Sequence, residues 1–228
     1  MRKIPRPQRF PRFVVGAGLL AALTIGVSAC GSQVPDIPPP ATQAPAPIAG
    51  AAPDGVTTPA QAFGPACQQL PQSGIPGSAL MMANQPVATA LATDPLAKTF
   101  AVAVQKANLV GTLNEAKSAT VFVPYESAFT DLQQSLGPDR FNALLSNPSA
   151  LADVLKYHVV VKRYDRIALV AARSVSTLQG GNLKINDAGD TVNITDNAGK
   201  TAHVLCGNLP TTNATIFLID KVLNPQAP

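Results

Sequence analysis

The stretch that most constrains the fold is TVFVPYESAF, which runs from Thr120 to Phe129. Its first four residues are good strand formers, and a run this apolar is typical of a strand buried on both faces. Pro124 has no N–H and holds the preceding residue in extended geometry, so the strand ends there. Apolar residues then recur at helical spacing as far as Leu136, which predicts a helix that packs back on the strand. This strand–proline–helix corner is the expected centre of the fold and carries no catalytic group.

Residues 1–29 are predicted to be a lipoprotein signal peptide, which takes no part in the fold. Five basic residues and no acid precede an apolar run from Phe13 to Val27. That run is too short to be counted as a membrane-spanning helix. It ends in Val-Ser-Ala-Cys, which resembles a bacterial lipobox, so Cys30 would carry diacylglycerol and become the first mature residue. The alternative is an ordinary signal peptide cut after Ala29, with Cys30 left free.

The net charge of the chain comes from this signal peptide. The chain has 17 Lys and Arg against 13 Asp and Glu; without the five basic residues before Cys30 the balance is 12 against 13, or −1. We therefore expect no nucleic-acid partner. No later segment is long and apolar enough to span a bilayer, so the lipid on Cys30 would be the membrane attachment. The expected location is the extracytoplasmic face of the cell membrane, and a shed or secreted fraction stays open.

Residues 30–54 are rich in proline and alanine and nearly uncharged, which predicts a disordered tether. With Cys30 lipidated, Cys67 and Cys206 remain as a pair in an oxidising compartment, and we expect a disulfide between them. It would join the irregular start of the domain, residues 61–77, to the penultimate strand. A metal or redox role is the alternative, but the chain has no C-x-x-C motif and only two histidines. No metal or cofactor is expected.

Residues 55–228 are predicted to form one domain with its own core. The segment from Leu109 to Leu113 is expected to lead directly into the central strand. In addition to the helix after Pro124, five helices are expected: Val87–Ala92, one capped by Asp94, one begun by Pro138, one begun by Pro148, and a short one capped by Asp165. The strands expected after Tyr157 are 159–161, 175–178, 183–186, 191–195, 200–205 and 215–223. Helices first and strands afterwards indicate the α+β class.

Three blocks of the chain resemble the fasciclin (FAS1) domain family: TVFVPYESAF, LKYHVV at Leu155–Val160, and ATIFLIDKVLNP at Ala214–Pro225. The resemblance covers residues 80–228. Within the family it is greatest to the secreted and lipid-anchored fasciclin-domain antigens of mycobacteria. It implies a wedge or sandwich of β-strands with helices along one side, and an extracellular interaction role such as adhesion. Tyr125 and Glu126 stand where the family usually has a threonine and an asparagine that supply a helix-capping oxygen.

Tyr157 and His158 match the family's Tyr-His pair and are the candidate interaction residues, since the resemblance links this pair to receptor binding in animal members. We favour the alternative that His158 is buried and hydrogen-bonded where helix passes into strand. Asp220 is expected to be a buried carboxylate held by turn amides. His203 has no evident partner in the sequence. The charged segment 162–166 is expected to be a solvated loop, or otherwise a contact for an acidic polymer.

The sequence contains no G-x-S-x-G, H-E-x-x-H or P-loop motif, so we expect no enzyme. The predicted function is that of a bacterial surface lipoprotein that mediates adhesion or protein interaction, with an unknown protein, matrix or host-surface ligand. The alternative is a carrier or sensor of an envelope lipid or glycolipid. A pocket lined by Phe100, Phe141 and Leu144 would favour this alternative. A hydrolase built around His158 or His203 comes third.

Overall fold

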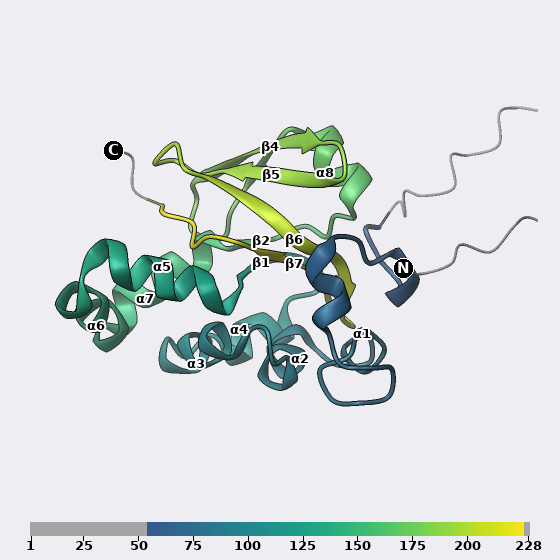
Figure 1. Ribbon diagram of the computed structural model, residues 1–228, viewed down its shortest axis with the longest axis horizontal. Helices are drawn as coiled ribbons and strands as arrows, with labels where there is room; N and C mark the ends of the chain where they lie inside the picture. Colours follow the sequence, from purple (N-terminus) through teal and green to yellow (C-terminus); the bar gives the residue numbers. More distant parts are fainter. Residues whose placement is uncertain (1–53, 226–228) are drawn as a thin grey trace, which may run out of the picture. The chain divides into compact units, whose positions relative to one another are not determined.

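The computed structural model describes residues 54–225, where one seven-stranded sheet is flanked by helices (Figure 1). The helical elements before the second strand are η1 Pro59–Gln61, η2 Pro65–Gln69, α1 Ala79–Met82, α2 Val87–Thr93, α3 Lys98–Lys106, α4 Val110–Glu115, α5 Glu126–Leu136, α6 Pro138–Ser146 and α7 Pro148–Tyr157. The strands are β1 Ala119–Pro124, β2 Val159–Val160, β3 Ser174–Ser176, β4 Asn182–Ala188, β5 Thr191–Thr195, β6 Thr201–Pro210 and β7 Ala214–Ile219, with α8 Arg166–Ala172 before β3. This order confirms the predicted α+β class.

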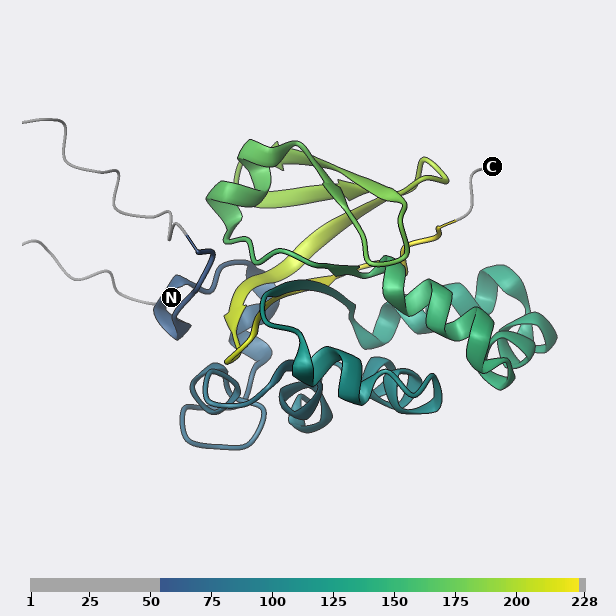
Figure 2. The ribbon, with the colours of Figure 1, turned by 180° about the vertical axis from the view of Figure 1, so that it is seen from behind.

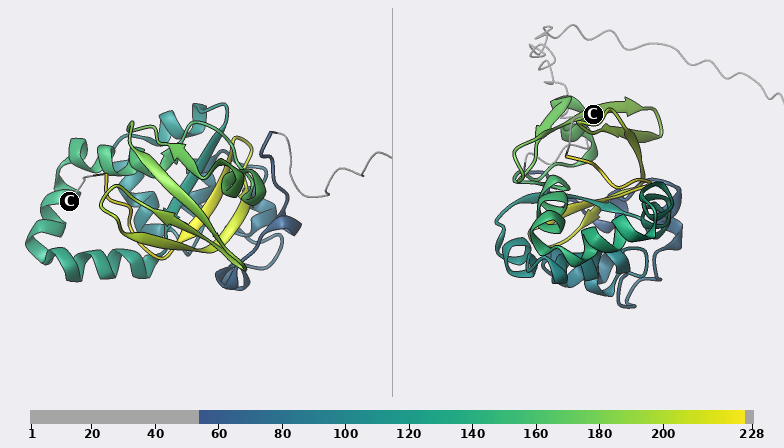
Figure 3. Two further views of the ribbon diagram at one scale, coloured as in Figure 1. Left: turned by 90° about the horizontal axis from the view of Figure 1, so that it is seen from above. Right: turned by 90° about the vertical axis from the view of Figure 1, so that its left-hand side faces the viewer.

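The sheet has the strand order β2-β1-β7-β6-β5-β4-β3. Only β1 and β7 pair in parallel, with Thr120 opposite Thr215, and the other described neighbours are antiparallel. The long strand β6 pairs with β7 on one side and β5 on the other, and crosses the sheet obliquely (Figure 3). The two edges meet at an isolated bridge between Val160 and Thr177. The two edge strands therefore cover each other at this point, and this limits the pairing of either edge with a strand of another chain.

Two apolar cores lie on either side of the central strands. Along β1 all six residues are buried; Val121 and Val123 pack with helices α1 to α4 and α7, whereas Phe122 packs with Phe217 in the second core. The second core lies between the central strands and β3, β4, β5 and α8. Figures 1 and 2 show this layering, with α1 to α4 on one side of β1 and β7 and with β4, β5 and α8 on the other. The prediction of a strand buried on both faces is confirmed.

The corner after β1 has the predicted form but not the family's usual cap. Tyr125 is the N-cap residue of α5, yet its side chain makes no capping hydrogen bond. Its hydroxyl instead donates to Oε1 of Gln69 at 2.7 Å. The carboxylate of Glu126 accepts from the backbone N–H and the hydroxyl of Thr99, at 2.8 and 2.7 Å. The two replaced residues thus connect the corner to η2 and to the start of α3.

Two helix predictions were wrong in detail. The helix capped by Asp94 begins only at Lys98, because the Asp94 carboxylate accepts from the N–H of Leu96 at 2.9 Å and holds a tight turn instead. Asp94 itself is the C-cap residue of α2. The segment that was expected to lead straight into β1 contains α4, a short helix in which only Leu113 is fully buried.

The strands also differ from the prediction at their ends. Tyr157 is the last residue of α7, and β2 comprises only two residues, so Val161 lies outside it with 63% exposure. Strand β6 runs on to Pro210, beyond the expected end, and β7 stops at Ile219. Asp220 therefore follows the last strand rather than lying buried within it.

The predicted disulfide is present between Cys67 in η2 and Cys206 in β6, whose Cα atoms lie 5.0 Å apart. It joins the irregular start of the domain to the penultimate strand, as predicted. Cys30 and the signal peptide at residues 1–29 lie outside the described residues. Within residues 54–225, the helices are all too short or too polar to cross a membrane.

Candidate functional site

The two candidate interaction residues, Tyr157 and His158, lie inside the domain with exposures of 0% and 1%. The hydroxyl of Tyr157 donates to the carbonyl of Asn182 at 3.0 Å and accepts from the N–H of Asn197 at 2.9 Å. This ties the end of α7 to β4 and to the loop after β5. Neither side chain is exposed in this structure, which agrees with the structural role that the sequence analysis favoured for His158.

His158 uses both ring nitrogens within the fold. Nδ1 lies 2.8 Å from the carbonyl of Val154, and Nε2 accepts from the N–H of Leu223 at 3.0 Å. A nitrogen facing a carbonyl must donate and one facing an N–H must accept, so the ring is neutral with its proton on Nδ1. Burial lowers the pKa of His158 to about 4, which keeps the ring uncharged at pH 7. The ring is therefore a structural link and not an acid–base group.

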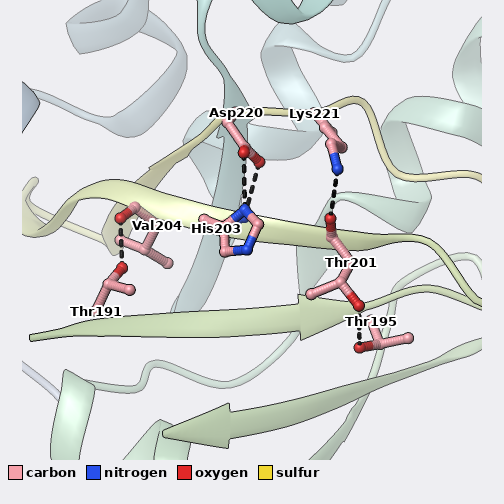
Figure 4. A network of polar contacts seen from close by, with 7 residues as sticks. All are labelled: Thr191, Thr195, Thr201, His203, Val204, Asp220 and Lys221. Carbon is pink, nitrogen blue, oxygen red and sulfur yellow. Dashed lines mark hydrogen bonds and ion pairs between the residues drawn. The ribbon is translucent and has the colours of Figure 1, made fainter. Parts of the chain in front are cut away.

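His203 and Asp220 form the polar pair shown in Figure 4. The carboxylate of Asp220 accepts from the backbone N–H of His203 at 2.7 Å, and its second oxygen lies 2.8 Å from Nδ1 of the ring. Nearby, Nζ of Lys221 donates to the carbonyl of Thr201 at 3.0 Å. These contacts tie the end of β7 to β6. The expectation of a buried Asp220 was wrong, since 28% of its side chain is exposed.

The pair does not assemble into a hydrolytic site. A His-Asp pair needs a nucleophile or a metal at the second ring nitrogen before it can act on a substrate. Among residues 54–225, the ring of His203 bonds through Nδ1 to Asp220, and this hydrogen bond brings no hydroxyl or thiol into the pair. The same part of the chain contains no group of three His, Cys, Asp or Glu that could hold a metal.

The three residues suggested for a lipid pocket do line one cavity. Phe100 of α3 and Phe141 and Leu144 of α6 line it together with residues of α5 and α7. The space inside is about 20 Å³, roughly the volume needed by one water molecule. Ligand pockets usually measure about 300–1,000 Å³, so these side chains form a packed core and not a preformed lipid site.

A wider cleft of about 490 Å³ lies beside α8, and we refer to it as the α8 cleft. The guanidinium of Arg166 lies 4.8 Å from the centre of the Phe63 ring and 3.4 Å from the carboxylate of Asp187. It also donates to the carbonyl of Gly189. Ile167 stands at the edge of the cleft with 47% exposure. The cleft therefore combines an aromatic ring, a charged pair and an exposed apolar side chain.

The floor of the α8 cleft includes an unusual backbone segment. Asn208 in β6 has φ of 58°, in the left-handed region that non-glycine residues rarely adopt. It accepts from the N–H of Arg166 at 2.8 Å and donates to the carbonyl of Gln61 at 3.2 Å. The pairing of β6 with β7 also shifts register on both sides of Cys206. Bulges are over-represented next to functional sites, so the register shifts beside Asn208 support the cleft as a candidate site.

The charged segment 162–166 is not the solvated loop that was expected. Arg163 and Asp165 are buried, with exposures of 7% and 1%. Nε of Arg163 donates to the hydroxyl of Thr215 at 3.0 Å, and Nη2 donates to the carbonyl of Thr211 at 2.9 Å. Burial also lowers the pKa of Arg163. Two members of the cluster are thus structural.

The α8 cleft could not be found from the sequence. Of the charged segment, only Arg166 lines this cleft. Phe63, Asp187 and Asn208 come from three other parts of the chain and carry no shared motif. The only sequence signal was the charged cluster itself, which pointed to Arg166 among its neighbours.

Comparison with known proteins gives a consistent family assignment. The Fasciclin domain family model matches residues 95–225. The cell surface glycolipoprotein MPT83 of Mycobacterium tuberculosis is 34% identical over 224 residues, which cover 92% of this chain and 95% of that protein. The immunogenic protein MPB70 of Mycobacterium bovis is 33% identical over 171 residues, covering 72% and 82%. A FAS1 domain pair from the insect cell adhesion molecule fasciclin I has the same fold, with a TM-score of 0.54 and 18% identity over 61% of this chain and 51% of that one.

Proposed function

The chain belongs to the fasciclin domain family, and we propose that it is a bacterial cell-surface lipoprotein that mediates adhesion or protein interaction without catalysis. The observation that carries the proposal is the match to the cell surface glycolipoprotein MPT83 over 92% of this chain. An alignment of that extent continues beyond residues 54–225 into the N-terminal segment that contains the lipobox-like sequence. In this proposal residues 1–29 are removed, Cys30 carries the lipid, and residues 30–54 connect it to the domain at residues 55–228.

The geometry of the described residues supports a binding role rather than a reaction. His158 is buried and neutral, and His203 is paired with Asp220 without a nucleophile among residues 54–225. We therefore look for a surface that could hold a partner. The α8 cleft is the best candidate, because it offers an exposed apolar side chain beside an arginine and an aromatic ring, and these residue types dominate protein interfaces. The partner class in this proposal is a protein, matrix or host-surface ligand.

The alternative of an envelope lipid carrier is not favoured by a specific observation. The apolar cavity at Phe100, Phe141 and Leu144 would have to open by more than tenfold in volume to hold an acyl chain. We retain this alternative only as one arm of the experiment below.

The test is binding by the mature chain, with the Cys67–Cys206 disulfide formed, to immobilised host matrix, to host cells and to total envelope lipid extract. We expect saturable binding to matrix or cells. Ile167→Asp should weaken it by at least about tenfold, because a charge would be buried at the contact. The control is Ile75→Asp, at an isoleucine that is 51% exposed compared with 47% for Ile167 and that lies away from the cleft. It should bind like the unchanged chain.

Each result has a defined meaning. Equal loss of binding in both variants, or in neither, would remove the α8 cleft as the contact face. Recovery of a defined lipid from the extract would move the carrier to first place. Binding to none of the three materials would contradict adhesion.

A further inference from the structure

Helix α3 presents a stripe of residues that is both apolar and basic. Lys98, Val102 and Lys106 recur every four residues along it, so their side chains share one side of the helix. All three are exposed, and Val102 has an exposure of 50%. An exposed branched aliphatic residue between two lysines is a suitable contact for a surface that is both negatively charged and apolar.

A groove continues this stripe across α2 and α4. It has a volume of about 210 Å³, and six of its eight lining residues are apolar, including Leu91, Val104 and Val110. Val110 of α4 lines it with 38% exposure. Gln105, which lines the groove, is exposed on α3 beside the stripe and so joins the two features. We call the stripe and the groove together the α3 face.

The exposed charged residues of helices α1 to α4 themselves are mostly basic, although the carboxylate of Glu126 from α5 lies against Thr99, next to Lys98. Between residues 79 and 117 the exposed charged residues are three lysines and Glu115, because Asp94 is buried. The α5 to α7 segment, residues 126–157, has the opposite balance of four acids and two bases. Residues 54–225 as a whole contain 12 basic and 12 acidic residues. The excess of lysines on these helices is therefore local, since the described chain as a whole is balanced.

We propose that the α3 face docks on the anionic phospholipid surface of the membrane that holds the lipid on Cys30. Lysines are attracted to the phosphates of such a surface, and the valines and the groove would enter the boundary between headgroups and acyl chains. This inference rests on the proposed lipoprotein function. It adds a second membrane contact to the diacylglycerol on Cys30, whose two acyl chains already hold the chain at the membrane, so its effect is on the orientation of the domain.

The membrane is favoured over an acidic protein partner by the length of chain before the domain. Cys30 and Asp54 are 24 residues apart. At about 3 Å per residue a proline-rich segment reaches at most some 70 Å. The anchored domain would therefore always stay within that distance of the membrane. Tethering converts a weak contact into an intramolecular one with an effective concentration in the millimolar range. A small patch that binds a membrane only weakly from solution can therefore stay docked when the chain is anchored.

Docking through the α3 face would also set the orientation of the domain. Figures 1 and 2 show α2, α3 and α4 on one side of the central strands, and α8 with β4 and β5 on the other. The α8 cleft would then point away from the membrane, toward a partner outside the cell. The two surfaces thus have separate tasks.

The first test uses the mature chain with Cys30→Ser, which removes the lipid, and sedimentation with vesicles. The vesicles contain phosphatidylcholine alone, or with about 30% phosphatidylglycerol as the anionic lipid. We expect binding to the anionic vesicles only, decreasing as salt is raised. Lys98→Glu with Lys106→Glu should lower the bound fraction at least about tenfold, and Val102→Asp about fivefold.

Matched controls separate this face from general surface effects. Val161→Asp changes a valine that is 63% exposed, and Lys184→Glu with Lys200→Glu makes the same charge change on exposed residues elsewhere. These variants should bind within about twofold of the unchanged chain. Equal losses in test and control variants would overturn the proposal, as would equal binding to both kinds of vesicle.

The second test uses the lipidated chain in anionic bilayers and in detergent micelles, compared by hydrogen exchange. Amides in residues 98–110 should exchange several-fold more slowly in the bilayer, while those of α8 should not change. Protection that appears without lipid and grows with protein concentration would instead show a second copy on this face. The mass of Cys30 tests the lipoprotein proposal separately: an unmodified cysteine would contradict that proposal, while the vesicle experiment would still decide the role of the α3 face.

Discussion

At the scale of single residues, Asn213 satisfies backbone groups from two helices that lie about a hundred positions earlier in the chain. Its Oδ1 accepts from the N–H of Val87, the first residue of α2, at 2.9 Å. Its Nδ2 donates to the carbonyls of Leu113 and Ala116, at the end of α4, at 2.8 and 3.0 Å. Asn213 lies in the turn between β6 and β7, a position that does not reveal its role. When a distant residue caps a helix end, the sequence near that helix contains no capping motif from which the cap could be predicted.

We expect Asn213→Ala to lower the free energy of unfolding by about 2–3 kcal/mol, because an N-terminal donor and several C-terminal acceptors lose their partner together. Urea denaturation of the disulfide-bonded chain would measure this. Asn186→Ala, at an exposed asparagine on β4, should change it by less than about 0.5 kcal/mol. Similar values for the two variants would show that the hydrogen bonds of Asn213 add little to stability.

At the scale of elements, the start of α3 is capped by a residue of α5. Ala97, the N-cap residue of α3, has no side-chain oxygen, and the carboxylate of Glu126 accepts from Thr99 in its place. Because Glu126 is also the first residue of α5, its charge lies near the positive ends of two helix dipoles. The glutamate that replaces the family's usual asparagine therefore links two helices.

Glu126→Ala should cost about 2 kcal/mol of stability, since α3 loses a charge-assisted cap. Glu126→Gln keeps an acceptor for the N–H of Thr99 and should cost less than half as much. Thermal or urea unfolding would rank the variants, with Glu115→Ala on the exposed end of α4 as the control. If the glutamine variant is as unstable as the alanine variant, charge and not hydrogen bonding carries the effect.

The sequence identified those elements whose burial follows a regular period. The corner at Pro124, the helices begun by Pro138 and Pro148, and β5 all have their expected positions. Helix α4 was missed because six residues give too little periodicity, and so short a helix depends on tertiary packing. The prediction ended β6 at Leu205 because bulges around Cys206 interrupt its alternation.

At the scale of the whole molecule, some contacts between distant segments can be predicted from the residue types involved, and others cannot. The Cys67–Cys206 disulfide was predictable because the pairing follows from the cysteine count and the compartment, and its loop of 139 residues gives an entropic stabilisation of roughly 5 kcal/mol as an upper figure. The α8 cleft was not predictable, because it depends on how α8, β4 and β6 meet. No local property of Phe63 or Asn208 indicates that they meet there.

The stability of the whole domain also depends on two buried groups that titrate in opposite directions. Burial raises the pKa of Asp94 from 3.8 to about 6, and repulsion from Glu126 adds to this despite a hydrogen bond from Leu96. One oxygen of Asp94 is buried without a partner among residues 54–225. Burial lowers the pKa of His158 from 6.5 to about 4, although the charge of Asp196 acts the other way.

The signs of the two contributions follow from proton binding. Between pH 6.5 and 4 the folded His158 binds fewer protons than the unfolded one, so its contribution to stability is lost as the pH falls. Between pH 6 and 3.8 the folded Asp94 binds more protons than the unfolded one, so stability is gained as the pH falls. Each shift corresponds to about 3 kcal/mol. The two contributions oppose each other, and we expect the unchanged chain to be almost equally stable from pH 6.5 to pH 4.

Removing one of the two groups should reveal how the other changes stability with pH. Asp94→Asn should make the domain lose about 3 kcal/mol between pH 6.5 and 4, because only His158 then titrates, whereas His158→Gln should make it gain a similar amount. Urea unfolding at pH 7, 5.5 and 4 would give these slopes, and a double variant should restore a flat profile.

Parallel profiles for all four chains would mean that neither buried group is linked to folding. A fall in both single variants would mean instead that Asp94 is already ionised and paired. The contrast matters for the proposed location at the cell surface, because a domain whose two buried titrations cancel keeps its α8 cleft and α3 face intact when its surroundings become acidic.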